Sequence, residues 1–313
     1  MPDEIKNNAL TPIRQRIHDS MLDIYLNPGK GKEAMYQHSV LCQTYFPYRN
    51  QGDDVKMWQH KQGDIQLAIT ANPILNPYTR EYEQIGIPYG SKPRLILAYL
   101  NTQAIKKQSS ILNVEESMTA FIKSLGLSND GRTIKEVKEQ MRRLMTANIT
   151  LGYIQDNKVQ QVDFKIVDAF EFWFPKDERQ RVFWESKIQL SDKYFNSLQQ
   201  HAIPLDERAL SALAHNALAL DIYSWLAQRL HRINPAKPQF VAWTNLKEQF
   251  GFGYSEIRKF RQIFNRTLKE VQKQYMEAKF EVDGSKGIYL YNSAPPIKKT
   301  MIVMPEKPFG LIV

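Results

Sequence analysis

Arginine and glutamine side chains recur at four-residue intervals near the C-terminal end of the chain, at Arg258, Gln262 and Arg266. Residues four apart lie on one face of a helix, so these three side chains would project in the same direction. Arginine can donate two hydrogen bonds to the edge of guanine, and glutamine can pair in a similar bidentate way with adenine. The spacing therefore predicts a helix face that reads base pairs in a duplex. Other basic or amide side chains nearby are predicted DNA contacts, the lysines through phosphate: Lys259, Arg261, Asn265, Lys269, Lys273 and Lys286.

The opposite face of the same segment is apolar. Its residues recur at steps of three and four, as on the buried side of a long helix: Ile257, Phe260, Phe264, Leu268, Val271 and Tyr275. Segments 279–282 and 286–291 then flank a glycine-containing turn, which predicts a hairpin. A helix followed at once by a hairpin is the order of a winged-helix DNA-binding module. The alternative is an ordinary surface helix whose charges only serve solvation.

A second helix with one apolar and one basic face is predicted to begin near residue 131. Its outer face carries further predicted DNA contacts: Arg132, Lys135, Arg142 and Arg143, with Lys138 at the flank. Strands at 149–154 and 159–174 follow, so the helix-then-hairpin order recurs without detectable sequence identity between the two copies.

The sequence thus predicts an α+β protein with tandem winged-helix domains. The first domain would cover 64–190 and contact DNA, and the second, at 191–294, would be the main DNA reader. Residues 1–63 would form a small N-terminal region of unknown role, and 295–313 an extended C-terminal tail. Within 1–63, apolar spacing predicts helices near 13–24 and 33–43, and 45–61 is predicted to be polar and turn-rich.

Charge is distributed unevenly along the 313 residues, whose net charge is +9. Residues 1–84 hold 9 Lys and Arg against 10 Asp and Glu, whereas 85–313 hold 33 against 23. The basic part is therefore the part with the predicted helices and hairpins, as a polyanion-binding body requires. No run approaches 18 consecutive apolar residues, which argues against a membrane span. The single cysteine, Cys42, excludes an internal disulfide and suits a cytoplasmic protein.

The sequence lacks the residue sets that several catalytic reactions need. A DNA-nicking enzyme needs paired histidines to hold a metal beside a tyrosine, but the six histidines are scattered along the chain. The glycine–lysine run at 29–32 does not have the spacing of a phosphate-binding loop. His38 and Cys42 alone do not make a structural zinc site. The aromatic run 170–174 could stack on single-stranded bases, but packing within a strand is the favoured interpretation. No cofactor is therefore predicted.

Several segments resemble the plasmid-encoded RepA-type replication initiator family. They are 87–95, 121–127 (FIKSLGL), 169–174 (AFEFWF), 184–195 (WESKIQLSDKYF), 203–206 and 218–226 (LALDIYSWL). The resemblance covers roughly residues 64–295, about three quarters of the chain, and none of these segments is a catalytic signature.

The resemblance implies a non-enzymatic protein that binds repeated double-stranded DNA sites (iterons) at a plasmid origin and helps to open the duplex. Host replication initiator and helicase proteins would be its partners. A homodimer formed through the first domain, 64–190, would repress its own promoter and so take part in copy control. A winged-helix transcriptional regulator is the main alternative. An origin-nicking nuclease is the alternative from another class, and the absence of paired histidines disfavours it.

Overall fold

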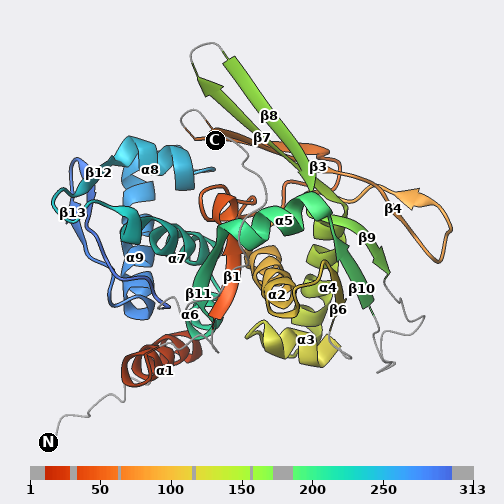
Figure 1. The fold of residues 1–313 in the computed structure, drawn as a ribbon, viewed down its shortest axis with the longest axis horizontal. Coiled ribbons are helices and arrows are strands. Elements are labelled where there is room, and N and C mark those ends of the chain that lie inside the picture. Colours follow the sequence, from red (N-terminus) through yellow and green to blue (C-terminus); the bar gives the residue numbers. More distant parts are fainter. Residues whose placement is uncertain are drawn as a thin grey trace, which may run out of the picture.

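The computed structural model describes residues 11–28, 34–62, 65–114, 118–155, 158–171 and 186–297, which form a mixed structure of helices and sheets (Figure 1). All strand pairs among these residues are antiparallel. Helices cover antiparallel sheets rather than alternating with parallel strands, which confirms the predicted α+β class. In the part of the chain described, no helix is long and apolar enough to cross a bilayer.

The C-terminal half contains a unit in which helix, strand, helix, helix and hairpin follow one another. Its elements are α7 (Ala217–Arg229), β12 (Gln239–Ala242), α8 (Trp243–Phe250), α9 (Ile257–Gln274), β13 (Phe280–Asp283) and β14 (Gly287–Leu290). The three strands form a sheet in the order β12-β14-β13. The predicted long helix and the predicted hairpin are thus both present, with ends close to those expected.

The apolar face of α9 explains why this segment is a helix. Phe260, Phe264 and Val271 are fully buried, and Leu268 is almost so. Phe264 meets Phe250 of α8 at a ring-centroid distance of 5.4 Å and Trp243 at 5.9 Å. The burial of several large side chains at a 3.6-residue period fixes which side of α9 faces outward.

The N-terminal half repeats the same order of elements. It runs through α2 (Ser91–Lys107), β6 (Ile111–Val114), α3 (Met118–Ser124), α4 (Gly131–Thr146), β9 (Val167–Glu171) and β10 (Ser186–Leu190). The sheet order is β6-β10-β9, which corresponds strand for strand to β12-β14-β13. Two units with the same connectivity therefore occur in one chain.

The hairpin predicted directly after α4 does not belong to this repeated unit. β7 (Ala147–Gln155) and β8 (Lys158–Lys165) join β2 (Met57–Gln62) and β3 (Ile65–Ala71) in a sheet of order β2-β3-β7-β8. The strand predicted at 159–174 ends at Lys165, because Ile166 and Val167 are both buried and so break the alternation of a single strand. The chain resumes there as β9. Residues 172–174 of the predicted strand lie outside the described residues.

The N-terminal segment is built into the body of the protein. The prediction of a helix at 33–43 was wrong, because β1 (Ala34–His38) pairs with β11 (Ala202–Asp206) and leads into the short 3-10 helix η2 (Ser39–Cys42). All five residues of β1 are buried, so its sequence lacks the alternation that identifies a half-buried strand. The interpretation of 45–61 as polar and turn-rich holds for 49–56, which has turns and exposed side chains but no helix or strand. It was wrong at the two ends, where Tyr45 and Phe46 are buried and β2 begins at Met57.

The remaining elements connect or flank these parts. They are α1 (Pro12–Leu26), β4 (Ile74–Leu75), β5 (Tyr82–Glu83), α5 (Asp192–His201), α6 (Glu207–Leu213) and η3 (Leu230–Arg232). Figure 1 shows α2, α3 and α4 on one side of the β1–β11 pair and α7, α8 and α9 on the other. The predicted boundary at residue 63 falls between β2 and β3, which are paired.

A buried ion pair joins the two units. Arg94 of α2 donates from Nε and Nη2 to the two carboxylate oxygens of Asp221 in α7, at 2.7 and 2.8 Å. Its remaining donors reach the carbonyl oxygens of Gly90 and Phe46. Burial alone would lower the pKa of Arg94, but the Asp221 carboxylate outweighs it and the pKa is raised. A single apolar core surrounds this pair and extends through both units.

We expect Asp221→Asn to lower the free energy of unfolding by about 3–5 kcal/mol, because it leaves the Arg94 guanidinium buried without a counter-charge. Urea denaturation followed by circular dichroism measures this loss. The control is the double variant Arg94→Met/Asp221→Leu, which removes both charges and should cost less than the single change. A loss below about 1 kcal/mol for Asp221→Asn would contradict this account of the joint.

His38, at the end of β1, is a buried neutral imidazole. Its Nδ1 accepts a hydrogen bond from the Val40 amide, so Nε2 carries the proton and donates to Ser197 Oγ at 3.0 Å. The ring stacks on Tyr194 and lies 6.1 Å from the ring of His201. Burial, and then the nearby His201, lower the pKa of His38 to about 4.

Because the unfolded chain binds a proton at His38 more readily, stability should fall as the pH drops from about 6.5 towards 4. We expect His38 to account for about 2 kcal/mol of lost unfolding free energy between pH 7 and pH 5. Urea titrations at the two pH values should show a smaller loss for His38→Gln than for the wild type. The exposed His18 provides the matched control, His18→Gln, and an equal pH dependence in all three proteins would refute the assignment.

Candidate nucleic-acid interface

α9 presents a basic face to solvent, opposite its buried apolar residues. The side chains on this face are all exposed: Arg258, Lys259, Gln262, Arg266, Lys269 and Lys273. None of the five cations among them forms an ion pair with a described residue. Unpaired cations on one helix face attract a polyanion, since binding releases the counterions condensed on it. The structure thus brings six predicted contact residues to one face.

The β13–β14 hairpin is fixed in position beside this helix. Arg261 of α9 donates from Nη1 to the carbonyl oxygen of Gly284 at the hairpin tip, at 2.9 Å. Trp243 of α8 donates from its indole nitrogen to the carbonyl oxygen of Asp283, also at 2.9 Å. Lys286, the predicted phosphate contact of the hairpin, is exposed at the same turn. Helix and hairpin therefore present their cations as one preorganised surface.

The turn of the hairpin is shaped by the Asp283 carboxylate. Its Oδ1 accepts hydrogen bonds from the Ser285 hydroxyl and from the backbone amides of Ser285 and Lys286, at 2.8–3.0 Å. The Ser285 hydroxyl, followed by these amides, lowers the pKa of Asp283. An aspartate followed by glycine is a common turn signal, and here the aspartate also orients the lysine that follows.

Two predicted contacts on α9 are less available than the rest. Arg261 is half-buried, and its guanidinium is committed to Gly284. Asn265 is half-buried as well, and its side-chain oxygen is buried without a hydrogen-bond partner among the described residues. Both lie at the border between the apolar and basic faces, where helical spacing alone does not decide exposure.

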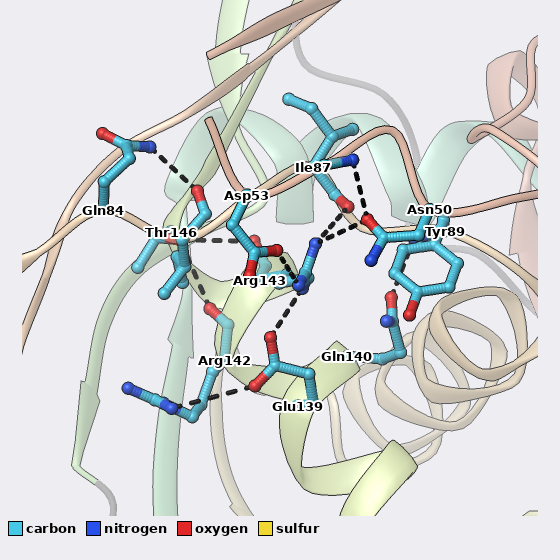
Figure 2. Close-up of polar contacts among 12 residues, drawn as sticks. Asn50, Asp53, Gln84, Ile87, Tyr89, Glu139, Gln140, Arg142, Arg143 and Thr146 are labelled. Carbon is cyan, nitrogen blue, oxygen red and sulfur yellow. Dashed lines mark hydrogen bonds and ion pairs between the residues drawn. The ribbon is translucent and has the colours of Figure 1, made fainter. Parts of the chain in front are cut away.

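Arg143 of α4, a predicted DNA contact, points into the protein (Figure 2). Its side chain is only 4% exposed, and it pairs with Asp53 at 2.5 Å and with Glu139 at 2.7 Å. It also donates to the carbonyl oxygen of Ile87 and lies over the ring of Tyr89. The prediction placed Arg143 on the outer face, but the N-terminal segment covers that part of the helix. Arg143 therefore stabilises the fold through these buried contacts.

The close approach of the segments around Arg143 requires a glycine. A Cβ on Gly86 would lie 2.6 Å from Nη1 of Arg143 and 2.7 Å from the carbonyl oxygen of Gly52. Both distances are shorter than real Cβ contacts, and one of the two atoms is backbone that cannot rotate away. Gly86 therefore allows the 50–53 loop to reach the guanidinium.

The other predicted contacts of α4 are largely compensated by acidic neighbours. Arg142 forms an ion pair with Glu83 of β5 and lies 3.8 Å from Glu139, so it too was wrongly placed on a free outer face. Arg132 is exposed but lies 2.8 Å from Glu136, which also binds Lys92. Of the remaining predicted residues, Lys135 is exposed and Lys138 is half-buried.

The two units thus differ in how they use their basic helix. On α4 the arginines form ion pairs with Glu83, Glu136, Glu139 and Asp53. On the outer face of α9, by contrast, no cation lies within ion-pair distance of a described carboxylate. α9 is therefore the stronger candidate for the main nucleic-acid contact.

We expect Arg143→Met to lower the free energy of unfolding by about 1–3 kcal/mol, because it removes several hydrogen bonds to partly buried groups. DNA affinity measured by fluorescence anisotropy should stay within about twofold of wild type, since the side chain has no access to a ligand. The exposed Lys135 on the same helix supplies the control, and Lys135→Met should leave stability unchanged. Weakened DNA binding by Arg143→Met with full stability would show that the side chain does reach DNA.

Comparison with known proteins assigns the chain to a family. The family described as "Plasmid encoded RepA protein" matches residues 87–245, about half of the chain. The chain belongs to the plasmid-encoded RepA family. The RepA match begins just before α2 and ends within α8, so α9 and its hairpin lie beyond it. No curated protein matches the chain.

Two crystal structures of domains 2 and 3 of RctB resemble this member of the RepA family in fold. One, of a selenomethionine derivative, has a TM-score of 0.52 at 10% sequence identity and covers 80% of this chain and 94% of the RctB chain. The other has a TM-score of 0.51 at 11% identity, covering 80% and 95%. Such low identity shows similarity of fold alone. RepA family membership supports a role in replication initiation.

Proposed function

We propose that this protein is a plasmid replication initiator that binds repeated duplex sites at its origin through α9. The observation that carries the proposal is the row of exposed cations on α9 that form no ion pair with a described residue. They are held beside a hairpin whose turn carries Lys286. Membership of the RepA family supports the biological setting. The protein acts by binding and not by catalysis.

In this proposal the C-terminal unit is a winged helix. The order helix, strand, helix, helix, hairpin and the strand order β12-β14-β13 support it, because they place α9 and the hairpin side by side. A helix with its side chains is about 10–12 Å across, which matches the roughly 12 Å width of the major groove. α9 enters that groove, and the hairpin reaches the adjacent phosphates or minor groove.

Base reading falls to Arg258, Gln262 and Arg266, which stand four residues apart on the exposed face. The lysines at 259, 269, 273 and 286 bind phosphates and hold the helix in register. The first unit, also a winged helix in this proposal, adds weaker phosphate contacts through Arg132 and Lys135, since its other arginines are paired with carboxylates.

Family membership supports the finer functions in this proposal. The bound protein helps to open the duplex and recruits a host initiator and helicase, and a homodimer formed through the first unit represses its own promoter. This repression takes part in plasmid copy control, and the protein acts in the cytoplasm. The sites repeat head to tail as iterons.

The proposal is tested with the DNA that flanks the gene. We expect Arg258→Ala or Arg266→Ala to cost about 1–3 kcal/mol on the footprinted site and to relax base preference, whereas Lys269→Ala should weaken specific and random duplexes alike. Fluorescence anisotropy at several salt concentrations measures both effects, and Lys269→Ala should also reduce the salt slope by about one. Equal losses on specific and random DNA for all three variants would refute base reading by α9.

Two further measurements separate this function from its alternatives. A transcriptional regulator with the same fold would bind the same DNA but would not allow a plasmid carrying that DNA to replicate in a cell that supplies the protein in trans. A nicking nuclease would relax supercoiled origin plasmid in the presence of magnesium, and an initiator would leave it supercoiled.

A further inference from the structure

The N-terminal helix α1 contacts the C-terminal end of α9, more than two hundred residues away in sequence. Gln274, the last residue of α9, is only 1% exposed. Its Nε2 donates to the carbonyl oxygen of Ile17, and its Oε1 accepts from the Ser20 hydroxyl, both at 2.8 Å. Ile17 itself is buried between the helices. Both polar ends of a buried glutamine are thus satisfied by α1.

A second set of contacts holds α1 beside α6. Arg208 donates from Nη1 to the Asp23 carboxylate at 3.0 Å and to the carbonyl oxygen of Asn27 at 2.9 Å. The same guanidinium pairs with the buried Asp206 at 2.7 Å, so it is already fixed when α1 binds it. The Ser20 hydroxyl also lies 3.1 Å from the carbonyl oxygen of Arg208. α1 is therefore held at its middle and at its C-terminal end.

On its other side α1 is open. A cleft of about 750 Å³ separates it from the end of α3, and is lined by Arg16 and Asp19 of α1 and by Lys123 and Leu125 of the first unit. Leu22, Tyr25 and Leu26 of α1 remain exposed. The polar contacts described above join α1 to α9 of the second unit and to α6, and Figure 1 shows α1 beside these two helices.

We propose that α1 is a positioning element for the DNA-reading helix. α9 is packed along its length by apolar residues of its own unit, but the polar side chain at its C-terminal end has hydrogen-bond partners on α1. Without these two hydrogen bonds the last turn of α9 loses its polar attachment to α1, so it would shift or fray. Lys269 and Lys273 lie in that part of the helix, and their register on the phosphates depends on it. This inference rests on the proposed function of α9.

The test uses the full chain with Gln274→Met, which keeps the volume and removes both hydrogen bonds. We expect affinity for the footprinted origin site to fall about tenfold, because DNA must then order the helix end that one to two net hydrogen bonds held in the free protein. Affinity for random duplex should change by less than about twofold, because it depends on charge rather than on register. Gln272→Met alters the exposed glutamine two residues earlier and should match wild type. A fall of the same size on both duplexes would overturn the proposal.

A second variant and a second readout keep the test independent of folding losses. Asp23→Asn removes the exposed carboxylate that pairs with Arg208, and it should reduce the ratio of specific to random affinity in the same direction but less. Hydrogen exchange without DNA should show faster exchange in the last turns of α9 for Gln274→Met, with α7 unchanged. Unchanged exchange in α9 would refute the inference even if α9 reads DNA. If Gln274→Met shows the expected faster exchange but the wild type does not prefer origin DNA over random duplex, the proposed function is refuted instead.

Discussion

The buried pair of Arg94 and Asp221 decides how the two units of this protein stand relative to each other. Two charges removed from water are tolerated only when each is fully compensated, and here the guanidinium reaches a bidentate carboxylate and two backbone carbonyls. One of those carbonyls belongs to Phe46, so the N-terminal segment is part of the same joint. The units consequently share one apolar core, and the direction in which α9 faces is set by its packing on that core.

The repeated order of elements does not give the two units equal roles. Both have a basic helix followed by strands, yet the 50–53 loop brings Asp53, and β5 brings Glu83, to the arginines of α4. A cation that is already paired with a carboxylate gains little free energy from binding a phosphate, because the carboxylate already compensates its lost hydration. The cations on the outer face of α9 form no ion pair with a described carboxylate. The same architecture therefore serves as a framework in one half and, in the proposed function, as a binding surface in the other.

The sequence predicted the features that local periodicity determines. The apolar stripe from Phe260 to Val271 identified α9, and Asp283-Gly284 identified its turn. It failed where burial or distant contacts decide. β1 is buried on both faces and shows no alternation, and the helical arithmetic that placed Arg143 outward contains no information about Asp53, ninety residues earlier. The hydrogen bonds of Gln274 to α1 are equally invisible, because a polar residue at a helix end is normally taken as solvated.

The residues that the family match covers separate the framework of the protein from the outer face of α9. Residues 87–245 include α2, α7 and the Arg94–Asp221 pair, but they end before α9 and the hairpin. The residues that identify the family therefore belong to the framework. The residues proposed to recognise a particular DNA sequence lie outside the matched segment. The framework requires complementary partners at fixed distances, whereas an exposed helix face can change its side chains without disturbing the core beneath. Under the proposed function, a protein built this way can keep its core while the exposed side chains of α9 change to suit a different origin.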